Sequence, residues 1–300
     1  MLQNRRRLSP WTALVAVLAV GSLGPATAWS RPPAAKLLPE KTALLVSVAD
    51  CPDLAKRFMN TAMGRMSQDP QLSPLVKYLY GSAADLVAKA KEQIGLSLPE
   101  ILSIPQGEFT FALVPTEDEG PAVVILLDTG NQVANARGLW QRATGFLDKS
   151  GAAKSQENVG GTEVSIYDGV GPQRRKVVFF EKDATLVLAT SVQVARPILE
   201  VWNGGSGKTL NDNANFAAIL SRCRGDTGEE SQVIWFVDPV AILRAAGQRN
   251  PGLQLVLALL PTLGLDGLQG AGGTMAFDAG QFDAISQAHL LLENPRSGVF

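Results

Sequence analysis

The chain has 300 residues, with 27 lysines and arginines against 28 aspartates and glutamates, so its formal net charge is −1. Hydrophobic residues make up 46% and charged residues 18%, which excludes a disordered chain and allows a sizeable core. The sequence has no long basic cluster for phosphate binding, which argues against a nucleic acid partner. Two cysteines are too few for a disulfide framework. Cys51 and Cys223 could form one disulfide with each other, or they could be two separate buried thiols.

The first residues, 1–28, have the features of a secretory signal peptide. Arg5–Arg7 precede an uncharged apolar run from Trp11 to Val20, and Ala26–Ala28 supplies small residues for cleavage. The alternative is an uncleaved membrane anchor, but this run is about half the length of a membrane span. We therefore expect an exported mature chain that begins near Trp29, in the periplasm or at the cell surface. The signal carries three arginines and no acid, so its removal changes the net charge from −1 to −4.

The predicted elements then follow in chain order. Residues 29–43 are rich in proline and small residues, which predicts an extended tether. Leu44–Val48 is a short aliphatic run typical of a buried strand, and Asp50 with Pro52 predicts the start of a helix. Further along we expect helix 74–94, strands 109–114 and 122–127, a helix with an apolar stripe over 133–147, strands 164–167, 177–180 and 186–189, and helices 192–202 and 214–222.

The next segment repeats the first pattern. Val233–Val237 is an aliphatic strand followed by Asp238, Pro239 and an amphipathic helix, as Leu44–Val48 is followed by Asp50. This indicates an internal repeat of about 190 residues. We predict an α/β fold, in the sense of mixed α+β, with a mixed β-sheet, packed helices and a repeated module. Residues 44–230 would form the first module and 231–300 the start of a second, truncated one; a complete protein that ends at 300 is the alternative.

No motif in the sequence assigns a catalytic, cofactor-binding or metal-binding residue. Gly204–Thr209 resembles the end of a phosphate-binding loop, but Trp202 stands where that loop needs glycine, so a flexible connector before a capped helix is expected. His289 is the only histidine, and its surroundings predict a partly covered strand residue rather than a catalytic base. One histidine and two distant cysteines offer no paired metal ligands.

Two patterns keep functional alternatives open. Asp50, Asp128 and Asp238 each follow a strand, where carboxylates serve a hydrolase or, more commonly, cap a helix. The segment Leu253–Leu265 is strongly apolar and contains Pro261. A buried core helix is the ordinary interpretation, and a docking surface for a partner or a membrane is the alternative.

Several stretches together resemble an uncharacterised family of exported bacterial proteins that is defined by a domain of unknown function. The resembling stretches are spread over most of the mature chain and are 38–43, 121–130, 160–164, 184–199 and 210–220. The resemblance implies an envelope protein with repeated α/β modules and no known activity, and it carries over no catalytic residue.

The leading hypothesis from the sequence is therefore an exported, non-catalytic envelope protein that binds an envelope component or another protein. Peripheral membrane contact is a further option. The alternative of a different class is a hydrolase that acts on an envelope polymer through carboxylates at strand ends. No cofactor is expected.

Overall fold

The computed structural model describes residues 31–69, 71, 104–117, 119–149, 151–170, 175–223, 230–248, 250–262, 265 and 267–293. The chain divides into a short unit, Met1–Pro32, and a large unit, Pro33–Phe300. The predicted signal peptide and the predicted helix 74–94 lie outside the described residues. The fold below is that of the large unit.

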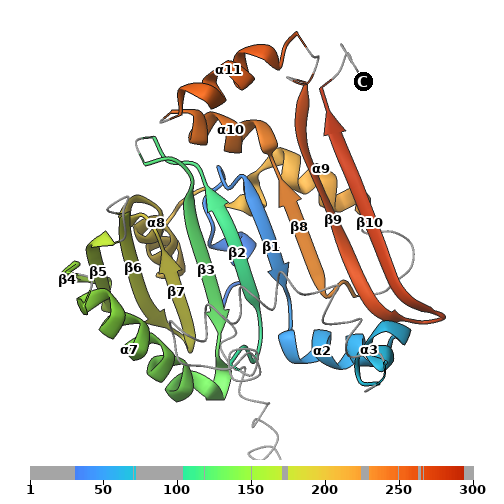
Figure 1. Cartoon of the computed structure of the whole chain (residues 1–300), viewed down its shortest axis with the longest axis horizontal. Helices are drawn as coiled ribbons and strands as arrows, with labels where there is room; N and C mark the ends of the chain where they lie inside the picture. Colours follow the sequence, from blue (N-terminus) through green and yellow to red (C-terminus); the bar gives the residue numbers. More distant parts are fainter. Residues whose placement is uncertain are drawn as a thin grey trace, which may run out of the picture. The chain divides into compact units, whose positions relative to one another are not determined.

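A ten-stranded sheet forms the centre of this unit (Figure 1). The strand order is β10-β9-β8-β1-β2-β3-β7-β6-β5-β4, and every pairing is antiparallel. The strands are β1 (Leu44–Val48), β2 (Phe109–Val114), β3 (Ala122–Asp128), β4 (Ala153–Val159), β5 (Thr162–Val170), β6 (Arg175–Lys182), β7 (Thr185–Ala189), β8 (Val233–Val237), β9 (Leu268–Ala279) and β10 (Phe282–Leu292).

The predicted combination of helices packed on a sheet is confirmed, with two differences. The sheet is antiparallel, whereas the sequence predicted a mixed one. The strand that follows β1 in the described residues is β2, and the strand that follows β8 is β9; each pairs antiparallel with the strand before it, as the strands of the hairpins do. A repeated module is not shown. The strands β8, β9 and β10, expected to begin a second module, continue the same sheet beside β1.

Seven α-helices occur in the described residues. They are α2 (Cys51–Asn60), α3 (Ala62–Ser67), α7 (Val133–Lys149), α8 (Val192–Trp202), α9 (Ala214–Cys223), α10 (Pro239–Gly247) and α11 (Pro251–Leu259). Three 3-10 turns complete the helical structure of these residues: η1 (Ala34–Lys36), η2 (Gly130–Gln132) and η3 (Leu210–Asp212).

Successive residues of β6 show which helices cover which face. Phe179 stacks on Trp140 of α7, with ring centroids 3.8 Å apart. Phe180, the next residue, points the other way and packs with Leu199 of α8 in the main core. Because neighbouring strand residues point to opposite faces, α7 and α8 lie on opposite sides of the sheet, in front of and behind the strands in Figure 1.

The main core lies on the α8 and α9 side. Phe180, Ile198, Ile219 and Phe236 are all fully buried there. Phe236 also meets Phe216 of α9 edge to face, with centroids 5.5 Å apart. Burial of large apolar side chains of this kind contributes about 1.5 to 3 kcal/mol each.

The N-terminal end of this unit is part of the same core. Leu37 and Leu38 are buried next to η1, and Pro39 forms a bridge with Thr209. The stretch 33–43 therefore differs from the extended tether that its prolines predicted. Burial of two adjacent leucines outweighs the local preference for extended backbone.

Candidate binding surface on the open face of the sheet

The face of the central strands that points away from α8 and α9 is entirely apolar. The strand registers place the following side chains on it, and we call this set the apolar face: Leu44, Val46 and Val48 of β1; Val233, Trp235 and Val237 of β8; Phe109, Phe111 and Leu113 of β2; and Val123, Ile125 and Leu127 of β3. Antiparallel sheets with one solvated face usually carry polar residues on that face. The composition of the apolar face is therefore that of a surface built to be covered.

Burial alternates along β1 and β2, and along β3 as far as Leu127. In β1, Leu45 and Ser47 point to the core and are buried, whereas Leu44 and Val48 on the apolar face are only half-buried. Val46 lies at the centre of β1, between the partners Phe111 and Trp235, and is 38% exposed. A valine so exposed in the middle of a ten-stranded sheet is unusual, because valine is among the residues most often buried.

The helices α2 and α3 lie at one end of this face. Phe58 of α2 meets Phe277 of β9 edge to face, with centroids 5.8 Å apart. Met275 of β9 is the cross-strand partner of Val233 and therefore points to the side of the apolar face. Phe277 is two residues further along β9, so its side chain points to the same side. From the same helical segment, Met59, Met63 and Met66 are exposed, Met63 by 59%.

The helices α10 and α11 lie at the other end of the sheet (Figure 1). Leu255, Val256 and Leu259 of α11 are exposed, Leu255 by 65%, and α11 contains no buried residue. The sequence interpretation of 253–265 as a buried core helix is therefore wrong for α11, whereas Leu260, directly after it, is buried. Segments as apolar as this one are usually buried, so the sequence alone predicts burial. Only the position of α11 in the structure shows that these side chains are exposed.

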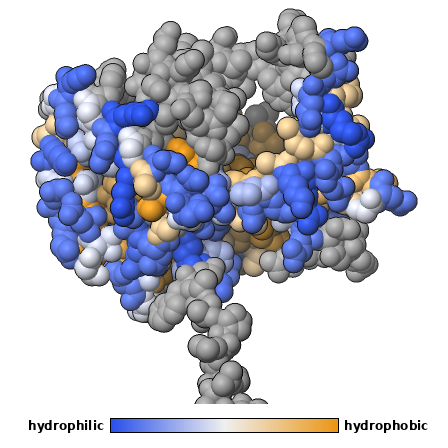
Figure 2. Space-filling view, turned by 90° about the horizontal axis from the view of Figure 1, so that it is seen from below, coloured by the Kyte–Doolittle hydropathy of each residue, from blue (hydrophilic) through white to orange (hydrophobic). Residues whose placement is uncertain are grey.

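Hydrophobic residues are visible at the molecular surface as well. Figure 2 views the molecule from the lower end of Figure 1 and shows orange and tan residues within a recess beside the hydrophilic surface. None of the described helices has both the length and the apolar character needed to cross a membrane.

The three strand-end aspartates are not assembled into one site. The Asp50 carboxylate accepts a hydrogen bond from the backbone N–H of Asp53 at 2.8 Å, and the Asp238 carboxylate accepts one from Ala241 at 2.8 Å. Both are helix caps, as predicted. Since β1 and β8 are antiparallel, Asp50 and Asp238 follow opposite ends of the sheet.

Asp128 lies at the same end of the sheet as Asp50 and accepts a hydrogen bond from the N–H of Gly130 at 3.0 Å. Burial raises the pKa of the neighbouring Cys51 thiol to about 11, and the carboxylates of Asp50, Asp128 and Glu108 add to the shift. Cys51 is therefore a protonated thiol at neutral pH, which is a poor nucleophile and a poor metal ligand. Cys51 and Cys223 are both free thiols.

A polar hollow of about 360 Å³ opens on the α7 side of the sheet. Arg137 of α7 holds Glu181 through two hydrogen bonds of 2.6 Å, and this contact raises the pKa of the Arg137 guanidinium. Glu163 lines the same hollow and accepts a hydrogen bond from Gln156 at 2.6 Å. Both carboxylates are thus occupied by partners of their own.

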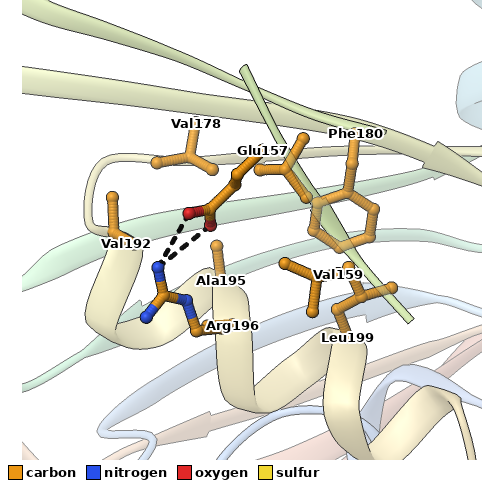
Figure 3. Close-up of a pocket in the computed structure, with 9 residues that line it drawn as sticks. Glu157, Val159, Val178, Phe180, Val192, Ala195, Arg196 and Leu199 are labelled. Carbon is orange, nitrogen blue, oxygen red and sulfur yellow. Dashed lines mark hydrogen bonds and ion pairs between the residues drawn. The ribbon is translucent and has the colours of Figure 1, made fainter. Parts of the chain in front are cut away.

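The space between α8 and the sheet is a packing seam. Figure 3 shows Arg196 of α8 bound to Glu157 of β4 over apolar side chains, with N–O distances of 3.1 and 2.8 Å. The seam has no room for a water molecule. It therefore offers no site for a ligand.

The remaining sequence candidates have structural roles. The residues around Gly204–Thr209 form a connector after α8, and Asp212 accepts hydrogen bonds from both the N–H and the hydroxyl of Thr209, as a capped helix start predicts. His289 is half-buried on β10 and lies 2.9 Å from a guanidinium nitrogen of Arg222, as expected for a partly covered strand histidine. No group of His, Cys, Asp and Glu suited to a metal ion occurs in the described part of the chain.

Comparison with protein families, with curated proteins and with solved structures finds no match to this chain. The resemblance to the exported family accordingly stays a prediction. The apolar face was not among the sites expected from the sequence. Its signal is present, however, because β1, β2, β3 and β8 are apolar at nearly every position rather than at alternate ones.

Proposed function

We propose that this chain is an exported binding protein that accepts an apolar ligand, the hydrocarbon chain of a lipid, on the apolar face. The observation that carries the proposal is the position of Val46, an exposed aliphatic residue at the centre of a face made only of apolar side chains. This refines the hypothesis, drawn from the sequence, of a non-catalytic envelope protein.

The chemistry of the surface favours a hydrocarbon over a polar molecule. No residue of the apolar face carries a charge or a hydrogen-bonding side chain except the indole N–H of Trp235. Transfer of a methylene group from water to an apolar site contributes about 0.8 kcal/mol. About ten covered methylenes supply roughly 8 kcal/mol before ordering costs, and those costs limit the net affinity.

The exposed methionines of α2 and α3 support the same proposal. Methionine side chains are unbranched and polarizable, so a surface that contains them adapts to ligands of different shape. Met59 of α2 follows Phe58, whose ring meets Phe277, and so offers such a surface near the end of the apolar face; Met63 and Met66 extend the exposed surface along α3. The predicted signal peptide would deliver the protein to a compartment bounded by membranes, where lipids are available.

The hydrolase alternative has less support. Two of its three proposed carboxylates, Asp50 and Asp238, cap helices at opposite ends of the sheet. The two carboxylates of the polar hollow, Glu163 and Glu181, are engaged by Gln156 and Arg137. We therefore assign the apolar face, and not a carboxylate pair, as the functional site.

The proposal is tested by titration of the full chain with a fluorescent long-chain fatty acid. We expect saturable binding to the unsubstituted protein and a loss of at least tenfold in affinity for Val46→Asp. Val46→Thr keeps the shape and strand preference of the side chain but adds a hydroxyl to the centre of the apolar face, so it should weaken binding without unfolding the protein. Ser155→Asp, on the exposed edge strand β4, is the matched control and should bind normally. The absence of saturable binding by the unsubstituted protein would refute the proposal.

A further inference from the structure

We infer that the outer edge of β10 pairs antiparallel with β10 of a second copy of this chain. The first reason is the character of the edge. Among the described residues β10 is the last strand of the sheet and pairs only with β9. It extends over 11 residues, about 36 Å at 3.3 Å per residue, which is about twice the usual strand length.

The two edges of the sheet differ in how well they are protected. The opposite edge strand, β4, carries Lys154 and Glu157, and Glu157 is engaged by Arg196. Charges on an edge strand discourage pairing with another chain. In β10 the stretch Ala284–Leu292 has no Asp, Glu, Lys or Arg. Asp283 is the one charged side chain of β10, so among the described residues the rest of this edge strand lacks the usual protection.

The position of β10 in the sheet is equivalent to that of a fully paired strand. The order β10-β9-β8-β1-β2-β3 is symmetric about the antiparallel pair of β8 and β1. In this symmetry β10 corresponds to β3, and β3 is paired on both sides, with β2 and β7. A strand on the outer side of β10 would complete the correspondence.

The sequence of β10 is complementary to itself in one antiparallel register. With Ser286 opposite Ser286 of the second copy, Phe282 faces Leu290, and these are the two exposed large apolar residues of the strand, at 55% and 46%. The same register places Asp283, whose carboxylate accepts the N–H of Ala62, opposite His289, which lies 2.9 Å from the Arg222 guanidinium. Favourable cross-strand side-chain pairs each stabilise a sheet by about 0.2 to 1 kcal/mol.

This arrangement is a two-fold symmetric interface, in which each contact occurs twice. It is independent of the apolar face, because the paired atoms are backbone groups at the rim of the sheet. The partner that we propose for this edge is a second copy of the chain. The alternative partner is a different polypeptide that adds an extended strand to the same edge.

Sedimentation equilibrium of the full chain provides the first test, and we expect twice the mass of a single chain. Ala288→Lys places a charge on the exposed edge and should give a single-chain mass. Ser155→Lys on β4 is the matched control and should leave the doubled mass unchanged. A single-chain mass for the unsubstituted protein, at concentrations near 100 μM where weak pairing would show, would overturn the proposal.

Cysteine cross-linking tests the register separately. Ser286→Cys should form a disulfide between two copies under mild oxidation, because a residue opposite itself brings its Cβ atoms within disulfide range. Ala288→Cys should not, since in this register it faces Ala284. Cross-linking of both variants at equal rates, or of neither, would contradict the register, and a different protein recovered on this edge would contradict the second copy.

Discussion

Val46 and Trp235 are direct cross-strand partners at the middle of the central pair of strands, and both point to the apolar face. Their neighbours in β1 and β8 on the other face, Leu45 and Phe236, are fully buried. The sheet is thus as apolar on this side as on its core side. Here the described residues of α7, together with Ile104, pack near Leu127 and Phe179, while Val46 stays 38% exposed. This asymmetry is the basis of the proposed function.

Trp235 should report ligand binding directly. A hydrocarbon over the apolar face removes water from the indole, so its fluorescence should shift to shorter wavelength as a fatty acid is added. Trp202 lies on α8 on the other side of the sheet, and Trp140 of α7 is stacked on Phe179, beyond the apolar face; Trp11 and Trp29 lie outside the described residues. The shift should therefore disappear in Trp235→Phe while binding remains. A shift that persists in Trp235→Phe would place the ligand away from this face.

The two helix caps should matter for stability and not for binding. Asp50→Ala and Asp238→Ala each remove a carboxylate that accepts a backbone N–H, and each should lower the free energy of unfolding by about 1 kcal/mol. Urea denaturation measures this change. Asp→Asn substitutions at the same positions keep an acceptor oxygen and should retain most of the stability. A loss of ligand binding in the alanine variants, with the fold intact, would contradict the purely structural role.

Cys51 should react slowly with alkylating reagents near neutral pH. Burial and then the Asp50 carboxylate raise the pKa of its thiol to about 11, and both act by disfavouring the negatively charged thiolate. The alkylation rate should therefore keep rising as the pH approaches 11. Asp50→Asn removes one negative charge, which should lower the pKa and speed the reaction at pH 9. A rate that levels off below pH 9 would contradict the assigned shift.

Two aliphatic residues separate core packing from surface exposure. Ile198→Ala leaves a cavity between α8 and the sheet and should cost about 2 to 5 kcal/mol in unfolding free energy. Leu255→Ser, at a position 65% exposed on α11, should change stability by less than about 0.5 kcal/mol. Thermal and urea unfolding measure the loss of unfolding free energy in each variant. A large loss for Leu255→Ser would show that α11 is covered.

Much of the element pattern could be predicted because strand and helix periodicities are local. The predicted strands 44–48, 109–114 and 233–237 coincide with β1, β2 and β8, and the predicted helix 192–202 coincides with α8. The predicted caps Asp50 and Asp238 are also confirmed. These features depend on residues a few positions apart, whose hydrogen bonds and packing follow from the immediate sequence.

Other features depend on contacts that no local pattern contains. The strand β4, Ala153–Val159, was missed because an exposed edge strand has polar residues on both faces and no apolar alternation. The antiparallel order follows from how β8 returns beside β1, across a separation of about 190 residues. The apolar face was missed for the same reason, since its residues come from four strands that only the topology brings together.

The dependence of affinity on chain length tests the central claim most directly. We would titrate the full chain with unlabelled fatty acids of increasing length by calorimetry. If the apolar face holds the hydrocarbon, each added methylene should strengthen binding by about 0.8 kcal/mol, a factor of about four in Kd, until the face is filled. The heat capacity change should be negative. No binding, or an affinity that is the same for short and long chains, would contradict the assignment of the apolar face as a hydrocarbon site.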